Sequence, residues 1–301
     1  MTGSMEPWVI ITIAAAALQT FRLMQQKRLK GLGLSVAGAS FSRFVYAAPL
    51  AIGLCLVLLA MGHAWPVAGA LFPVYVLAGG VGQIFGTVCT VALFSHRSFA
   101  VGSAFTKSET VQVAAFSALV LAEPVSAPGM AAILLGTGGV LLLSFPPGAW
   151  AGASLWNRSA ALGLAGGAFF AISAIGYRGA ALSLQSDDAL FRAGLALAAV
   201  TVFQTLAMGL WLMVREPGEI FRVLGNWRAT APVGATSMIG SLGWFVALAM
   251  MNAAYVRSVG QVELIFAALV SVLVFREKIT LREVLGMALL ACGIVGIVAV
   301  A

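Results

Sequence analysis

The sequence has few charged residues for its length. Only 9% of its 301 residues are Asp, Glu, Lys or Arg, whereas a soluble globular protein carries about 25%. Hydrophobic residues make up 61% of the chain, and the mean hydropathy is +1.03. This composition excludes a soluble globular protein and predicts an all-α, polytopic membrane protein.

Residues typical of metal sites and of catalysis are also scarce. Cys55, Cys89 and Cys292 lie singly in apolar segments, without the spacing of a metal site or a disulfide framework. His63 and His96 fall at predicted helix ends, where polar residues meet the membrane interface. Because the sequence also has no ATP-binding motif, no Asp-rich motif and no His/Glu metal spacing, we predict no cofactor, no metal and no enzymatic activity.

Apolar stretches make up most of the sequence, and most of these stretches are about 20 residues long. Such a stretch forms a helix long enough to cross about 30 Å of hydrocarbon. We therefore predict about ten transmembrane helices, at 8–24, 35–61, 68–94, 98–121, 126–145, 160–183, 188–214, 230–252, 257–275 and 280–301. We expect the native chain to start at Met5 and to have no cleavable signal peptide.

The two halves of the chain repeat each other. An interval of 154 residues separates the members of three pairs: Glu109 and Glu263, Glu123 and Glu277, and Gly86 and Gly240. We predict two five-helix repeats, at 5–147 and 158–301, joined by a short linker that contains Pro146 and Pro147. Five spans per half place the second repeat upside down in the membrane, an arrangement found in many secondary transporters.

The net charge is +7, and the basic residues are distributed according to the predicted spans. The charge therefore does not indicate a nucleic-acid partner. Twelve of the seventeen basic residues fall on one side of the ten-helix arrangement: Arg22, Lys27, Arg28, Lys30, Arg97, Arg158, Arg215, Arg222, Arg228, Arg276, Lys278 and Arg282. Arg178 and Arg257 fall on the opposite side. The positive-inside rule places the twelve in the cytoplasm, so we predict a multi-pass protein of the bacterial inner membrane with both termini outside.

Five charged residues lie inside predicted spans: Arg43, Lys107, Glu109, Arg192 and Glu263. Burying each costs at least about 2.5 kcal/mol on insertion scales, so such residues usually face a partner or a watery pathway. For Glu109 and Glu263 we favour a binding or coupling role over static salt bridges. For Arg43 and Arg192 we favour a structural ion pair over coupling.

Lys107 breaks the symmetry, because Gln261 occupies the equivalent position in the second half. Lys107 and Glu109 are two positions apart, so they do not share a helix face and need not neutralise each other. A zwitterion could be held between such groups, although a structural counter-ion is the stronger interpretation of Lys107. Polar and aromatic residues at middle depth could complete a binding cavity or serve helix packing: Gln83, Tyr46, Tyr177, Trp244 and Asn252.

The five-plus-five spans, the arginines early in the second and seventh spans, and the turns beginning at Glu123 and Glu277 resemble the ten-helix EamA-like branch of the drug/metabolite transporter superfamily. The resemblance implies a carrier with a central cavity, working by alternating access and often exporting amino acids or related metabolites. Two features depart from the family. Proline does not follow Glu109 or Glu263, so no proline kink is expected there, and the charge distribution argues against the usual cytoplasmic termini.

We therefore predict a secondary active transporter, an exporter or exchanger, of a small polar metabolite such as an amino acid, a related zwitterion or an organic anion. Its partners would be this small-molecule substrate and the lipid bilayer, and its oligomeric state, possibly a monomer, is left open. An efflux pump for hydrophobic cations is the alternative within transporters. An intramembrane lipid-modifying enzyme is a weaker alternative, because the clustered acids or histidines that such chemistry needs are missing.

Overall fold

The structure is a computed structural model of the whole chain, and it describes residues 6–93, 105–144, 158–266, 268–269 and 280–301. Several predicted features lie outside the described residues: the linker between the halves, His96, Arg97, Arg276, Glu277 and Lys278.

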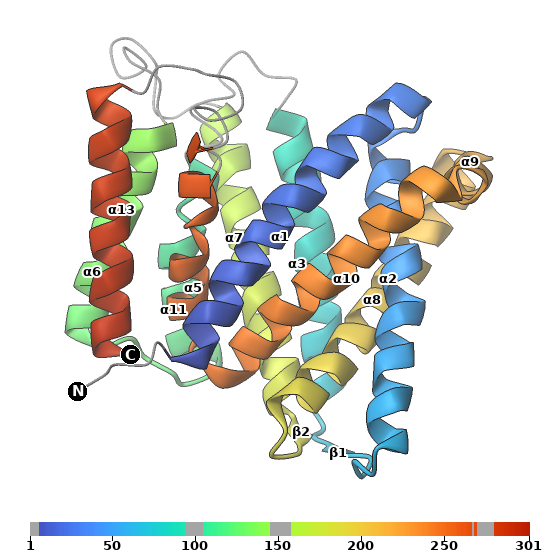
Figure 1. Cartoon of the computed structure of the whole chain (residues 1–301), viewed down its shortest axis with the longest axis horizontal. Helices are drawn as coiled ribbons and strands as arrows, with labels where there is room; N and C mark the ends of the chain where they lie inside the picture. Colours follow the sequence, from blue (N-terminus) through green and yellow to red (C-terminus); the bar gives the residue numbers. More distant parts are fainter. Residues whose placement is uncertain (1–5, 94–104, 145–157, 267, 270–279) are drawn as a thin grey trace. The chain divides into compact units, whose positions relative to one another are not determined.

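The described residues are almost entirely helical (Figure 1). The long helices are α1 (Pro7–Leu29), α2 (Val36–Ala60), α3 (Phe72–Leu93), α6 (Ala127–Ser144), α7 (Arg158–Leu182), α8 (Ala189–Arg215), α10 (Trp227–Met250) and α13 (Leu281–Val300). The shorter ones are η1 (Lys30–Leu32), α5 (Glu109–Val120), α9 (Glu219–Gly225) and α11 (Ala253–Gly260). A two-residue antiparallel ladder joins β1 (Val67–Ala68) to β2 (Leu184–Gln185).

Eight helices within the described ranges are long and apolar enough to cross a membrane. The prediction of an all-α, polytopic membrane protein is therefore confirmed. The count of ten spans and the internal repeat stay predictions. Pro49 lies inside α2, which is assigned as one continuous helix.

Helix starts recur at the interval seen in the sequence. Helices α6 and α13 begin 154 residues apart, and each follows a hydroxyl residue. The Ser126 hydroxyl accepts a hydrogen bond from the backbone N–H of Gly129 at 3.2 Å. The Thr280 hydroxyl accepts one from Glu283 N–H at 3.3 Å, and the Glu283 carboxylate returns a bond to Thr280 N–H at 2.7 Å, completing a capping box.

The chain folds into two compact units. Unit 1 comprises residues 1–9, 81–175 and 251–301, and unit 2 comprises residues 10–80 and 176–250. Each unit draws on both predicted repeats, so the compact units do not coincide with the sequence halves 5–147 and 158–301.

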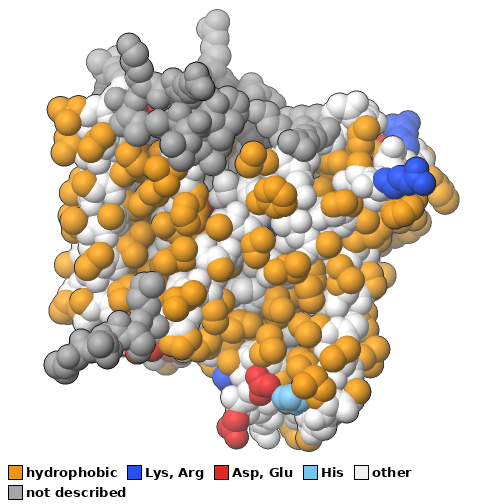
Figure 2. All heavy atoms as spheres, viewed as in Figure 1, with side chains coloured by type: hydrophobic (Ala, Val, Ile, Leu, Met, Phe, Trp, Pro, Cys, Tyr) orange, Lys and Arg blue, Asp and Glu red, His pale blue; other side chains and the backbone are white. Residues whose placement is uncertain are grey.

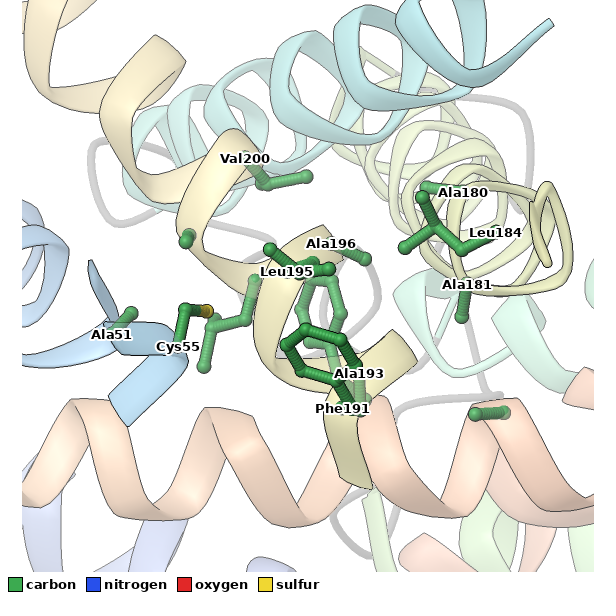
Figure 3. Close-up of a cluster of buried hydrophobic side chains, with 14 of the residues drawn as sticks. Ala51, Cys55, Ala180, Ala181, Leu184, Phe191, Ala193, Leu195, Ala196 and Val200 are labelled. Atoms are coloured by element: carbon green, nitrogen blue, oxygen red, sulfur yellow. The ribbon is translucent and has the colours of Figure 1, made fainter. Parts of the chain in front are cut away.

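Unit 2 is built on α2, α8 and α10, which pack on one another. Its core consists mainly of small and aliphatic side chains, with Phe191 fully buried. Figure 3 shows residues of α8 between Ala51 and Cys55 of α2 and Ala180 and Ala181 of α7. Small side chains let helix backbones approach closely, which matters where lipid provides no hydrophobic driving force between helices.

Charged residues gather at the two ends of unit 2. At one end, the Glu219 carboxylate accepts a hydrogen bond from Ser35 N–H at 2.6 Å and fixes α9 to the start of α2, near Arg222 and Arg228. The connection between α8 and α10 thus contains a helix, whose Glu219 is buried. At the other end lie His63, Asp187 and Asp188, between the end of α2 and the start of α8. Figure 2 shows acidic side chains, a histidine and a basic side chain gathered at one place on the visible face, and basic side chains gathered at another.

In unit 1, α6 and α13 run side by side (Figure 1). Glycines make this contact possible: a Cβ added at Gly293 would lie 2.6 Å from the Cα of Gly136, and one at Gly139 would lie 2.6 Å from the carbonyl oxygen of Gly286. The fifth and tenth predicted spans therefore pack against each other within unit 1.

Candidate functional site

The fourth and ninth predicted spans are interrupted within unit 1. In the fourth, a turn at residues 107–108 precedes α5. In the ninth, α11 ends at Gly260 and a turn at residues 261–262 precedes a new helical segment that starts at Glu263. The two turns are 154 residues apart, at equivalent positions of the sequence repeat.

These interruptions form without proline, so they are not the proline kinks whose absence we expected. In the fourth span, the Ser108 hydroxyl donates to the carbonyl oxygen of Phe105 at 2.6 Å, and Ser108 N–H donates to the same oxygen at 3.1 Å. A serine side chain that bonds its own backbone competes with the regular helical pattern. In the ninth span, Gln261 N–H likewise bonds three residues back, to Ser258, at 3.2 Å.

Glu109 and Glu263 occupy the same place relative to the two turns. Each is the first residue of the helical segment that follows its turn. The free N–H groups of a helix N-terminus favour a negative charge, which explains a glutamate at this point in each half. Glu109 is buried, with 5% of its surface exposed, and Glu263 is half-buried.

Each glutamate forms an ion pair with a base from the other half of the chain. The Arg257 Nε donates to Glu109 Oε1 at 2.7 Å, and the Arg257 Nη2 also contacts this oxygen. The Lys107 Nζ donates to Glu263 Oε1 at 3.1 Å. Lys107 and Glu109 thus point to different partners, and Lys107 acts as a counter-ion, the interpretation we favoured for it.

The two ion pairs differ in their access to the surface of unit 1. The side chains of Glu109 and Arg257 are 7% and 22% exposed, whereas those of Glu263 and Lys107 are both 21% exposed. A carboxylate sealed from water depends more strongly on its partner, because the surrounding dielectric constant is low. The Glu109–Arg257 pair is therefore the more rigid link, and the Lys107–Glu263 pair is the more accessible one.

Sequence reasoning missed Arg257, which we placed outside the membrane. In the structure α11 begins at Ala253, before the predicted start of the ninth span at residue 257. The Asn252 side chain caps this helix, its Oδ1 accepting from Ala254 N–H at 2.8 Å, and Arg257 lies more than one turn inside. Asparagine at the start of a helical pattern is the signal that could have located it.

Glycines of α7 allow this helix to approach the interruption in the fourth span. A Cβ added at Gly167 would lie 3.0 Å from the carbonyl oxygen of Thr106 and 3.0 Å from the Gln112 amide nitrogen. The same amide donates to the Ser108 hydroxyl at 2.7 Å. Gly167 therefore serves helix packing within unit 1.

The second half of the chain, residues 157–299, matches the EamA-like transporter family. This half of the chain is thus similar to a branch of the drug/metabolite transporter superfamily. No curated protein matches the sequence significantly. One solved structure, described only as "Crystal structure of protein", has a similar fold, with a TM-score of 0.72 and 15% sequence identity over 99% of this chain and 100% of the other. At that identity the likeness concerns the fold alone.

Two of the other predicted binding residues lie in unit 1 with structural contacts. The Gln83 side-chain Oε1 accepts a hydrogen bond from the Ser173 hydroxyl at 3.3 Å, which links α3 to α7. The Asn252 amide nitrogen donates to the carbonyl oxygen of Glu123 at 3.0 Å, in addition to the helix cap. These bonds match the helix-packing alternative, and a role in binding stays a prediction for both.

The aromatic candidates belong to unit 2. The Tyr46 hydroxyl accepts a hydrogen bond from the Thr230 hydroxyl at 3.2 Å and lies 3.5 Å from the carbonyl oxygen of Val223. The Tyr177 ring stacks on Phe245 with centroids 4.3 Å apart. Trp244, in α10, is 8% exposed. Contacts within unit 2 account for these positions, and substrate contact stays a prediction.

The arginines of the second and eighth helices also lie in unit 2. The Arg43 Nε donates to the Ser237 hydroxyl at 3.1 Å, and its guanidinium lies 5.1 Å from the centroid of the Phe44 ring. Arg192 is half-buried one turn into α8, which begins after Asp188. No carboxylate within 4.0 Å is recorded for either arginine among the described residues, so the structural ion pair predicted for them is not formed there.

Sequence reasoning also missed two buried arginines. Arg22 and Arg178 are each 7% exposed, although both were predicted near the membrane surfaces. The Arg22 Nη1 donates to the Gln26 side chain at 2.6 Å, and the Arg178 Nη1 donates to the carbonyl oxygen of Leu248 at 2.6 Å. An aromatic residue precedes each arginine, Phe21 before Arg22 and Tyr177 before Arg178. This shared pattern indicates that the two arginines occupy corresponding positions in the repeat.

Proposed function

We propose that this protein is a secondary active transporter of a small polar metabolite, an amino acid or a related zwitterion or organic anion, and that it works by alternating access as an exporter or exchanger. The observation that carries the proposal is the accessible Lys107–Glu263 ion pair at the interruption of the fourth and ninth spans. Interrupted helices with charged groups near the middle of a span are a common substrate-binding arrangement in secondary transporters.

The chemistry of this pair suits a zwitterion. The ligand's carboxylate would take the place of Glu263 beside the Lys107 ammonium, and its amine would take the place of Lys107 beside the Glu263 carboxylate. Binding then exchanges one internal ion pair for two charge-assisted bonds to the ligand. Both side chains are 21% exposed, which leaves them reachable by a solute.

The Glu109–Arg257 pair would have a structural role and would not bind the substrate. Its greater burial supports a role as the fixed link between the two interrupted spans, beside the exchangeable pair. An organic anion would need only the Lys107 ammonium and would leave Glu263 to be protonated, so the same site admits proton coupling. A hydrophobic cation would have to compete with Lys107 for Glu263 and with Arg257 for Glu109, which makes the efflux of such cations the weaker proposal.

Uptake into proteoliposomes tests the proposal. Purified protein would be reconstituted and assayed with radiolabelled amino acids, organic anions and quaternary ammonium compounds, with and without a pH gradient. We expect saturable uptake of a zwitterion or an anion, reduced at least about tenfold in kcat/KM by Lys107→Gln, since the lost charge-assisted bonds are worth about 1.5–3 kcal/mol.

Arg215→Gln is the matched control, because it removes one positive charge from the exposed end of α8. It should leave uptake unchanged. Unchanged transport of every substrate by Lys107→Gln would refute the binding role of this pair, and saturable uptake of quaternary ammonium compounds alone would favour the drug-efflux alternative. Uptake that does not respond to a pH gradient would remove proton coupling.

A further inference from the structure

Unit 1 contains a small cavity beside the interrupted spans. It has a volume of about 10 Å³ and lies among α5, α6, α11 and α13. A space of this size holds the centre of one water molecule. Four polar side chains line it, Thr110, Thr137, Ser258 and Gln261, and the rest of its wall is apolar.

Two of these polar groups are buried without a partner. Ser258 and Gln261 are 6% and 5% exposed, and neither the Ser258 Oγ nor the Gln261 Oε1 has a hydrogen-bond partner among the described residues. A buried polar atom left unsatisfied is costly in a protein interior, and more so inside a membrane. Both atoms belong to side chains that line the same cavity.

The hydroxyls of the two threonines can each accept a further hydrogen bond. The Thr137 hydroxyl donates to the carbonyl oxygen of Ile133 at 2.8 Å and lies 3.1 Å from the Thr110 hydroxyl. Since its proton is used in the first bond, Thr137 accepts in the second, and each hydroxyl oxygen keeps a free lone pair. The cavity therefore offers several acceptors together with the Ser258 hydroxyl as a donor.

We propose that this cavity binds one water molecule, which donates to the Gln261 oxygen and to a threonine hydroxyl and accepts from the Ser258 hydroxyl. A bare monovalent cation suits the site less well. It would leave the Ser258 proton unpaired, and the nearest carboxylates, Glu109 and Glu263, are already neutralised by Arg257 and Lys107. The water joins the start of α5 to the end of α11, next to the residues of the Glu109–Arg257 pair.

Two glycines of α6 provide a matched test that does not depend on the transport proposal. A Cβ at Gly136, which lines the cavity, would approach Gly293 and Leu290 no closer than 3.8 Å, so alanine fits there without a clash. A Cβ at Gly138 meets nothing within 4 Å. Both changes carry the same helix-propensity gain, and only Gly136→Ala places a methyl group at the cavity.

We expect Gly136→Ala to unfold about 2–4 °C below Gly138→Ala in detergent, because the methyl group displaces the water and leaves Ser258 and Gln261 unpaired. The effect of Ser258→Ala on the unfolding temperature should then depend on the background. We expect this substitution to lower the unfolding temperature of the wild-type protein and to raise that of Gly136→Ala. If the cavity is dry, the methyl group fills a void, and Gly136→Ala unfolds at or above the temperature of Gly138→Ala, which overturns the proposal.

A salt series separates water from a cation. The unfolding temperature of the wild-type protein should be the same in sodium, potassium and N-methylglucamine chloride at equal ionic strength. A higher temperature in sodium chloride that disappears in Ser258→Ala would identify a sodium ion as the occupant and overturn the water assignment.

Discussion

Glu109 and Glu263 begin equivalent helical segments, yet their surroundings differ. Glu109 is sealed against Arg257, with 7% of its side chain exposed, whereas Glu263 keeps 21% of its side chain exposed beside Lys107. Removing one member of a buried pair leaves the other charge unpaired where the dielectric constant is low. The resulting loss in the free energy of unfolding is much larger than the stability that the intact pair contributes. The two glutamates should therefore respond differently to the same substitution.

We expect Glu109→Gln to lower the free energy of unfolding by about 3–5 kcal/mol, because it strands the Arg257 guanidinium. Glu263→Gln should cost less than half as much, since the Lys107 ammonium can reach water. Thermal unfolding in detergent measures both. The double variant Glu109→Gln/Arg257→Gln should recover most of the loss, and equal losses at the two glutamates would contradict the difference in burial.

Asp188 joins a helix cap to a histidine at the acidic end of unit 2. Its Oδ1 accepts from Leu190 N–H at 2.8 Å and from Phe191 N–H at 3.3 Å, and its Oδ2 lies 2.8 Å from the His63 Nε2. Partial burial raises the pKa of Asp188, but the bonds from Phe191, His63 and Leu190 together outweigh it, so the pKa lies below its ordinary value.

A lowered pKa means that ionised Asp188 stabilises the folded state. This contribution is complete above the ordinary pKa of about 3.9 and is lost as the pH falls through the lower pKa of the folded protein. We therefore expect Asp188→Asn to lower the unfolding temperature at pH 5–6 and to make less difference as the pH approaches 3. The exposed Asp187→Asn is the control, and a difference from wild type that grows on acidification would contradict this assignment.

At the scale of elements, the α6–α13 pair depends on glycines that face the neighbouring helix. Gly139 lies so close to α13 that an added Cβ would stand 2.6 Å from Gly286 O and 2.6 Å from Leu290 N. These are backbone atoms, which cannot turn aside as a flexible side chain could. The contact between the two helices is thus set by backbone shape and not by hydrogen bonds between side chains.

Gly139→Ala should therefore push α6 and α13 apart. We expect a loss of about 1–3 kcal/mol in the free energy of unfolding, the usual cost of overpacking, despite the better helix propensity of alanine. The adjacent Gly138→Ala, which faces open space, should be neutral or slightly stabilising. Chemical unfolding in detergent compares the two, and equal stability of both variants would show that the helices are not held at this distance.

At the scale of the whole molecule, the chain is a multi-pass membrane protein whose second half matches a transporter family. In unit 2, Arg215, Arg222 and Arg228 lie exposed around α9, and the positive-inside rule assigns an end rich in basic residues to the cytoplasm. We propose that the protein resides in a bacterial inner membrane with the basic end in the cytoplasm and both termini outside.

Fusions to the C-terminus test this orientation. Alkaline phosphatase folds only outside the cytoplasm, and green fluorescent protein exported through the general secretory route is dark, so we expect an active phosphatase fusion and a non-fluorescent second fusion. A bright fluorescent fusion with an inactive phosphatase would place the C-terminus in the cytoplasm. The usual family orientation would then prevail over the charge distribution.

The sequence by itself determined the class of the molecule and the position of its glutamates. A chain with 61% hydrophobic and 9% charged residues has no alternative to helices in lipid, because each helix satisfies its own backbone hydrogen bonds. The 154-residue interval placed Glu109 and Glu263 at equivalent points, and the two interruptions fall at that same interval. These features are local or periodic, and composition and spacing encode them.

Only the tertiary structure decided which charges meet. Lys107 bonds Glu263 across 156 residues and Arg257 bonds Glu109 across 148, and no local pattern distinguishes these partners from others. Because α11 starts earlier than predicted, Arg257 lies in the site and not at the predicted surface. The interruptions of the fourth and ninth spans contain no proline, the residue that would have allowed a kink to be predicted from the sequence. Pairings of this kind follow from how helices distant in sequence pack, a relation that a one-dimensional pattern does not contain.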